Sequence, residues 1–108
     1  MRLTYLQSAL VEERKVREYL LSEERIEGKA AFFTAFGFAL ARWELLHDAL
    51  LLHATSHDVA LSVENPHGTK YIVEGALQTP DGRNPQVRSV WIINSGTVVP
   101  RLVTAYPL

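Results

Sequence analysis

The feature that most constrains the fold is a change of hydrophobic period near the middle of the chain. Up to about residue 57 the apolar side chains recur at helical spacing, whereas from Val59 onward they alternate or form short runs. Turn residues at Asn65–Gly68, Thr79–Arg83 and Asn94–Gly96 separate these runs. Helices followed by closely connected strands predict an α+β fold, with N-terminal helices packed on one face of a four-stranded antiparallel meander.

The first half of the chain is expected to form three helices. They span Val11–Leu21, Lys29–Phe36 and Leu40–Thr55, and Gly28 interrupts the pattern between the first two. Gly37 is well placed to end the second helix in a left-handed conformation. One apolar stripe is expected along the third helix, formed by Leu40, Trp43, Leu46, Leu50 and Ala54.

The second half is expected to form four strands, spanning Val59–Val63, Thr69–Leu77, Gln86–Asn94 and Val98–Tyr106. On the second strand, alternation places Lys70, Ile72 and Glu74 on one face and Thr69, Tyr71 and Val73 on the other. The same rule groups Arg88 with Val90 and Ile92, and Thr104 and Tyr106 with Leu102. Trp91 is expected in the core.

Length and composition narrow the class of protein. The 108 residues are expected to form one domain, helical over 10–57 and β over 58–107. The absence of cysteine excludes disulfides, cysteine-bound zinc and a thiol nucleophile. No apolar run is long enough for a bilayer and the first residues have no signal-peptide pattern, so a cytoplasmic protein without membrane association is expected.

Charge argues against a broad nucleic-acid-binding surface. The formal net charge is −1. Residues 64–108 nevertheless hold four basic against three acidic side chains. Binding of duplexes through many phosphate contacts is therefore not expected, and any anion site should be a local one.

Four stretches carry a resemblance to a known family. They are YLLSEERIEGKAAFFTAFGF (19–38), GTKYIVEGALQTPDGR (68–83), VRSVWIINSG (87–96) and PRLVTAYP (100–107). Together they resemble an uncharacterised bacterial domain family of unknown function that occurs near toxin–antitoxin and polymorphic-toxin modules. The order of helices and strands is also similar to the RelE/barnase/EndoU/colicin group of small nucleases. The family pattern has a Pro and a His before the Gly and Lys, where this chain has Glu24 and Arg25.

The resemblance implies a metal-independent ribonuclease whose site lies on the sheet. RNA cleavage needs a base for the 2′-hydroxyl proton, donors for the phosphorane charge and an acid for the leaving oxygen. The candidate catalytic residues are Lys29, Arg88, Thr104 and Tyr106. Lys70 and Arg101 are candidate phosphate-binding residues, and Tyr71 and His67 form a second tier. No metal and no cofactor are expected.

Each candidate also has a structural interpretation. Arg88 is a possible bidentate phosphate clamp or an arginine at the rim of the sheet. Lys29 is either an anion ligand at a helix start or a solvated lysine. Tyr106 is an acid, a base or a stacking platform, or else a half-buried sheet tyrosine. His67 is a general base or simply a turn residue.

Two histidines have the spacing of a metal pair. His53 and His57 are four residues apart, but no third ligand is placed by the sequence. The alternative is a polar helix end, where histidine suits the negative end of the helix dipole.

Two functions therefore remain open. One is a ribonuclease-like toxin domain acting on RNA, held in check by an antitoxin or immunity protein. The other is a non-catalytic protein-interaction module of a toxin–antitoxin-type or uncharacterised bacterial system. An exposed edge strand, either Val59–Val63 or the C-terminal strand, would allow a homodimer to form.

Overall fold

The computed structural model describes residues 9–22 and 29–108, and in them four helical elements precede four strands. The helical elements are the π-helix η2 (Lys15–Leu20), α1 (Lys29–Ala35), the 3-10 helix η3 (Leu40–Arg42) and α2 (Trp43–Ser56). The strands are β1 (Val59–Asn65), β2 (Gly68–Ala76), β3 (Gln86–Asn94) and β4 (Arg101–Pro107).

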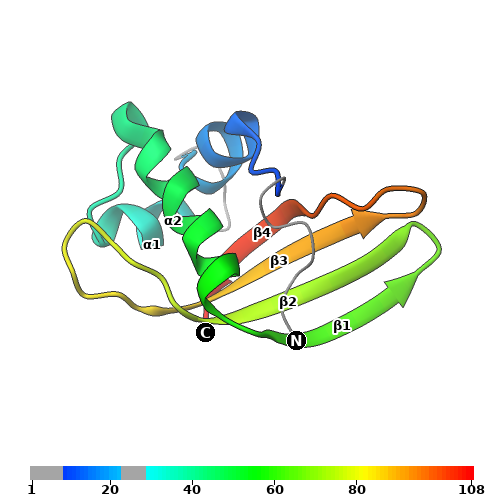
Figure 1. Ribbon diagram of the computed structural model, residues 1–108. Coiled ribbons are helices and arrows are strands. Elements are labelled where there is room, and N and C mark those ends of the chain that lie inside the picture. Colours follow the sequence, from blue (N-terminus) through cyan, green and yellow to red (C-terminus); the bar gives the residue numbers. More distant parts are fainter. Residues whose placement is uncertain (1–8, 23–28) are drawn as a thin grey trace.

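The strands form one sheet in the order β1-β2-β3-β4, and each neighbouring pair is antiparallel. The helical elements lie on one side of this sheet, where α2 crosses the strands (Figure 1). The predicted α+β fold, with helices on one face of a four-stranded antiparallel meander, is therefore confirmed. We call the face under the helices the covered face and the opposite one the open face.

The main core lies between the helices and the covered face. Its buried members include Val16 and Leu20 of η2, Phe33 of α1, Leu46 and Leu50 of α2, and Val73, Val87, Trp91 and Leu102 of the strands. Full burial of one such side chain stabilises a fold by about 1.5–3 kcal/mol. The core position predicted for Trp91 is confirmed, since that residue has no exposed surface.

The first helical segment is shorter than the predicted range Val11–Leu21. Helical backbone begins at Glu13 and continues as the π-helix η2. The N–H of Leu21 donates to the carbonyl of Val16 at 2.9 Å, which is the five-residue step of a π-helix.

Leu10 pairs with the edge of β4 and does not join a helix. It forms a parallel bridge with Arg101. Its N–H donates to the Pro100 carbonyl at 2.8 Å, and its carbonyl accepts from the Leu102 N–H at 3.0 Å. Leu10, the first residue of the predicted helical range 10–57, is therefore paired with the β4 edge and is not helical.

The glycine cap predicted after the second helix is confirmed. Gly37 has a φ of 100°. The Phe38 N–H donates to the Phe33 carbonyl at 3.3 Å and the Gly37 N–H to the Thr34 carbonyl at 3.0 Å, the two hydrogen bonds of a Schellman motif. The rings of Phe33 and Phe38, with centroids 6.3 Å apart, add the apolar contact that accompanies this motif.

The turn predicted at Thr79–Arg83 fastens the β2–β3 connection to the end of α1. The Gly82 N–H donates to the Thr79 carbonyl at 3.0 Å. The Arg83 guanidinium lies over the Phe36 ring at 4.4 Å and donates to the Ala35 carbonyl. Its position is fixed by Asp81, whose Oδ2 accepts from Arg83 Nε at 2.6 Å.

The third predicted helix is divided in two. Arg42 has φ −130° and ψ 50°, which breaks the helical path between η3 and α2. Leu46, Leu50 and Ala54 are buried as predicted. Leu40 is 48% exposed, because it precedes the break and its side chain is out of phase with the stripe.

A bulge in β4 corrects the predicted grouping of its side chains. Trp91 pairs with Leu102 while the adjacent Val90 pairs with Thr104, so Val103 is an extra residue between them. Leu102 is therefore on the covered face and is buried, whereas Thr104 and Tyr106 are on the open face. Simple alternation had placed all three on one face.

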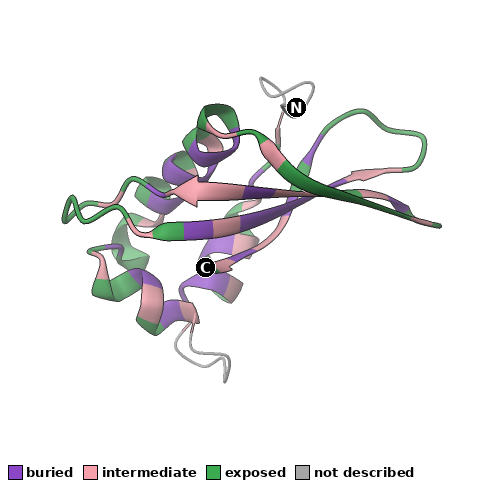
Figure 2. Cartoon of the chain, turned by 90° about the horizontal axis from the view of Figure 1, so that it is seen from below, coloured by how far each residue is buried: buried purple, intermediate pink, exposed green. Residues whose placement is uncertain are grey.

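β1 is an exposed edge strand. Its five residues from Ala60 to Glu64 are all exposed (Figure 2). Leu61 and Val63, which pair with open-face residues of β2, are 54% and 45% exposed. The edge of β4, by contrast, is partly occupied by Leu10. Pairing of two copies through β1 stays a prediction.

Candidate functional site

The register of the sheet places most of the candidate residues on the open face. Three cross-strand rows cover β2, β3 and β4 in turn. They consist of Lys70, Ile92 and Arg101, then Ile72, Val90 and Thr104, then Glu74, Arg88 and Tyr106. The predicted grouping of Arg88 with Val90 and Ile92 is confirmed by this register.

The third row is a connected polar group, which we call the Arg88 row. Arg88 Nε donates to Glu74 Oε2 at 2.7 Å, and Nη2 donates to the same oxygen. Nη1 of Arg88 lies 3.5 Å from the Tyr106 hydroxyl, and the guanidinium lies 5.7 Å from the centre of the Tyr106 ring. The hydrogen bonds to the Tyr106 hydroxyl and the Glu74 carboxylate raise the pKa of Arg88 above its ordinary value. The side chains of Arg88 and Glu74 remain 35% and 32% exposed, so solvent and solutes reach them.

A second group joins Lys29 to Thr104 through Tyr19 of η2. The Lys29 ammonium lies 5.2 Å from the centre of the Tyr19 ring, and the Lys15 ammonium lies 4.9 Å from it. Thr104 Oγ1 and the Tyr19 hydroxyl are 3.3 Å apart. We call Lys15, Tyr19, Lys29 and Thr104 the Tyr19 cluster.

The two groups adjoin along β4. Thr104 and Tyr106 are two residues apart on the open face, a separation of about 7 Å along a strand. The four candidate catalytic residues thus fall into two neighbouring groups, Lys29 with Thr104 and Arg88 with Tyr106. Lys29 comes from the helical half of the chain and Arg88 from the centre of the sheet.

The remaining candidates lie farther from the Arg88 row. Lys70 and Arg101 share the open face with it but belong to a row about 13 Å away along the strands. Arg101 Nε lies 4.0 Å from Glu12 Oε1. His67 is in the exposed β1–β2 turn, about 20 Å along β2 from Glu74. Tyr71 packs against the core on the covered face.

Glu74 is the member of the Arg88 row that the sequence-based candidates omit. It is the carboxylate closest to Arg88, and in an RNA-cleaving site a carboxylate is a competent proton acceptor. The signal for it was present, since Glu74 shares its predicted face with Lys70. Its position opposite Arg88 depends on strand register, which the connection between residues 77 and 85 sets.

His53 is not at a polar helix end, because its side chain is buried against the sheet. Nε2 lies 3.1 Å and 3.0 Å from the carbonyl oxygens of Gly75 and Val87, so it carries the proton that both can accept. Nδ1 then accepts from the Ser89 hydroxyl at 2.8 Å, and Ser89 accepts from Trp91 Nε1 at 2.9 Å. Every polar atom of this network is therefore satisfied.

His57 is occupied in a similar way and does not form a metal pair with His53. Its Nε2 donates to the Ala76 carbonyl at 2.9 Å, and its ring packs edge-on against that of His53 at 5.0 Å. Among the residues that the structure describes, no group of three histidine, aspartate or glutamate side chains is arranged to hold a metal ion.

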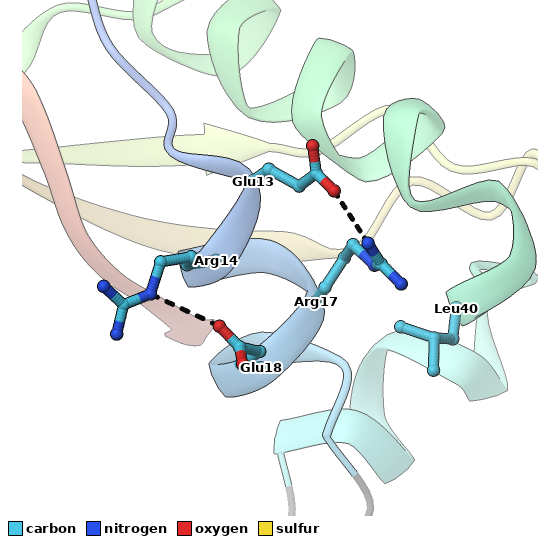
Figure 3. A pocket seen from close by; sticks show the side chains of 5 residues that line it. All are labelled: Glu13, Arg14, Arg17, Glu18 and Leu40. Atoms are coloured by element: carbon cyan, nitrogen blue, oxygen red, sulfur yellow. Dashed lines mark hydrogen bonds and ion pairs between the residues drawn. The ribbon is translucent and has the colours of Figure 1, made fainter.

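The surface of η2 borders a pocket of about 460 Å³, which Glu13, Arg14, Arg17, Glu18 and Leu40 line (Figure 3). Arg17 pairs with Glu13 at 2.7 Å and Arg14 with Glu18 at 3.3 Å. In each of these two ion pairs the partners are four residues apart along the chain, a spacing that stabilises a helix. Because each arginine is neutralised, this pocket is a poor anion site.

One departure from the family pattern lies outside the described residues. Glu24 and Arg25, which stand in the family's Pro and His region, belong to residues 23–28. In the rest of the chain, no helix is long and apolar enough to cross a membrane.

Comparisons with known proteins place the chain in a family. The comparison with curated proteins found no significant match. Among solved structures, the chain is similar to one in a contact-dependent growth inhibition toxin–immunity protein complex from Klebsiella pneumoniae 342. The TM-score is 0.74 at 17% sequence identity, and the match covers 93% of this chain and 100% of that one, which shows a shared fold. A model of a family described as a domain of unknown function, DUF6883, matches residues 2–108, and the chain therefore belongs to that family.

Proposed function

We propose that this protein is a metal-independent, ribonuclease-like toxin domain that acts on RNA at the open face of its sheet. The observation that carries the proposal is the Arg88 row, where a carboxylate, a guanidinium and a phenol are in contact and the two charged side chains are about one-third exposed. The likeness to a chain of a toxin–immunity complex supports a place in a toxin system, with a cognate immunity protein or antitoxin as partner.

The three side chains match the requirements of RNA cleavage. The Glu74 carboxylate takes the proton of the 2′-hydroxyl, whose oxygen attacks the adjacent phosphorus. Arg88 donates hydrogen bonds to the phosphorane oxygens as negative charge develops on them. Tyr106 gives its phenolic proton to the leaving 5′-oxygen, which yields a 2′,3′-cyclic phosphate and a free 5′-hydroxyl. Thr104 lies next to this row on β4 and, together with Lys29 of the Tyr19 cluster, supports the substrate backbone.

The test is inducible expression in a bacterial host, with total RNA examined after induction. Wild-type protein is expected to arrest growth and cleave cellular RNA. Glu74→Gln and Arg88→Ala are expected to lower cleavage about 100-fold or more, in line with removal of a general base or an oxyanion donor. Arg42→Ala is the matched control, because it removes an exposed cation from η3 that is outside both groups.

The purified proteins should also be added to a ribosome-containing translation extract, since some toxins cleave only ribosome-bound RNA. Absence of growth arrest and of RNA cleavage in both settings would contradict the ribonuclease function. Equal activity of wild type and Arg88→Ala would contradict the assigned site.

A second function, a non-catalytic interaction module of a toxin–immunity-type system, is favoured by two observations. The Arg88 fork is already bonded to Glu74, which suits a structural cross-strand pair, and the net charge of the chain is −1. This function predicts no RNA cleavage and tight association with a cognate partner. Co-purification with the product of a neighbouring gene, without growth arrest, would support it.

A further inference from the structure

Two lysines from separate elements converge on one aromatic ring. Lys15 belongs to η2 and Lys29 to α1, and both ammonium groups lie about 5 Å from the centre of the Tyr19 ring. The face of an aromatic ring attracts cations, so each ammonium group is held close to the Tyr19 ring. Two like charges gathered in this way repel each other unless an anion is present between or beside them.

The two lysines differ from the nearby arginines in their ion pairing. Neither forms an ion pair within residues 9–22 and 29–108, whereas nearby arginines do. A pocket of about 240 Å³ adjoins the ring, lined by Glu12, Arg14, Lys15, Glu18 and Tyr19. Its two acids are engaged by other cations, Glu18 by Arg14 at 3.3 Å and Glu12 by Arg101 at 4.0 Å.

The Tyr19 cluster adjoins the Arg88 row at Thr104 on β4. The Tyr19 hydroxyl contacts Thr104, and Thr104 is two residues from Tyr106 on the same face of β4. A polynucleotide lying across the Arg88 row therefore extends along β4 to the two lysines. The sequence offered no sign of this, since Lys15 belongs to a run of mixed charges on a helix face.

We infer that Lys15, Tyr19 and Lys29 form a second phosphate subsite for single-stranded RNA, which holds a phosphodiester next to the one cleaved at the Arg88 row. This inference rests on the proposed ribonuclease function. It implies that the substrate is an RNA strand with at least two phosphodiesters, one at the Arg88 row and one at the second subsite. Lys15 and Lys29 contact the phosphate, and Tyr19 positions the two ammonium groups.

The experiment measures binding of a short fluorescent single-stranded RNA in which every 2′-hydroxyl is O-methylated, so that the nucleophile is blocked and cleavage cannot occur. Fluorescence anisotropy gives the association constant between about 50 and 200 mM salt, a range over which phosphate contacts weaken steeply. Each phosphate contact on a single strand contributes about 0.7 to the slope of log K against log salt concentration.

Lys15→Met and Lys29→Met are each expected to lower the magnitude of that slope by about 0.7. Arg42→Met, which makes the same change in net charge on η3, is expected to leave it unchanged. Lys15→Arg keeps the positive charge and is expected to keep the wild-type slope. Comparison of Lys15→Arg with Lys15→Met separates a charge contact from a structural role. Tyr19→Phe keeps the ring and should retain the slope, whereas Tyr19→Leu should lower it.

The outcomes separate this inference from the proposed function. Wild-type binding with equal slopes for Lys15→Met and Arg42→Met overturns the subsite and leaves the Arg88 row in place. Failure of the wild type to bind RNA, alone or on ribosomes, overturns the subsite together with the ribonuclease function. A slope for Lys15→Arg that is as low as that for Lys15→Met also overturns the assignment.

Discussion

The imidazole of His53 lies between α2 and the strands β2 and β3, with both ring nitrogens hydrogen-bonded. Burial, the largest influence, lowers its pKa below the ordinary value for histidine, and the neighbouring His57 acts in the same direction. Protonation would place a second N–H against the Ser89 hydroxyl, which already accepts from Trp91 and donates to the imidazole. The folded state therefore favours neutral His53.

This arrangement predicts a pH-dependent stability. The unfolded chain takes up a proton on His53 more readily than the folded protein does. The stability that neutral His53 contributes to the folded protein is therefore fully present above about pH 6.5. It is lost as the pH falls below that value, by at most about 1.4 kcal/mol per pH unit for this group. Urea unfolding between pH 7.5 and 5 measures the loss. His67→Gln, in an exposed turn, should keep the wild-type profile, and His53→Gln should flatten it. A wild-type profile without slope would contradict the prediction.

Ser89 offers a test of the same network at constant pH. Ser89→Ala removes the acceptor of the Trp91 N–H and the donor to His53, and so leaves two buried polar groups without their partner. The expected loss is about 1–3 kcal/mol in the free energy of unfolding at pH 7.5. Ser95→Ala, in the exposed β3–β4 turn, is the matched control and should change it little. Similar stabilities of the two variants would show that the hydroxyl is dispensable.

At the level of elements, the sequence predicted the helices, the strands and their order along the chain well. The reason is that the spacing of apolar residues differs between a helix and a strand. Gly37 at the end of α1 is an example, since only glycine adopts its backbone conformation without strain. The bulge at Val103 is the opposite case. Arg-Leu-Val-Thr-Ala-Tyr contains no turn residue, and the extra residue is accommodated only because Leu102 fills the core while Thr104 pairs with Val90.

The glycine cap of α1 can be tested against another glycine of similar backbone conformation. Gly37 and Gly96 have φ of 100° and 83°, but a Cβ on Gly37 would lie 3.0 Å from Pro80 Cβ, whereas one on Gly96 meets nothing within 4 Å. Gly96→Ala is expected to cost about 1 kcal/mol from backbone strain alone, and Gly37→Ala about 1 kcal/mol more from crowding. Denaturant midpoints measure both. Equal losses of stability for the two variants would show that the 79–83 turn moves away from the added Cβ at no cost.

For the whole molecule, the shared core decides whether the two halves are separable. Buried side chains of η2, α1 and α2 pack directly on β2, β3 and β4. Neither half alone can bury its apolar face. The candidate site has the same dependence, since Lys29 and Tyr19 come from the helical half and Arg88 and Tyr106 from the sheet. Sequence pattern revealed which residues were polar but not which met, because these contacts join positions up to 85 residues apart.

Residues 1–108 are therefore predicted to unfold as one cooperative domain. The far-ultraviolet and near-ultraviolet circular dichroism signals should change together with urea, because the helices and the tryptophan on β3 share one core. A fragment of residues 1–57 should lack stable tertiary structure by itself. Separate transitions for the two signals, or a folded fragment, would overturn the prediction.

The extra residue in β4 has a consequence for how relatives of this protein are compared. One more or one fewer residue between Leu102 and Thr104 would turn the end of the strand over and bury Tyr106 without altering a single letter of the Thr-Ala-Tyr sequence. Two homologues that share the Thr-Ala-Tyr sequence can therefore present different side chains on the open face. Two homologues with different residues there can present the same side chains. Positions in this strand should be matched by the face that they occupy, and strand length deserves the weight usually given to residue identity.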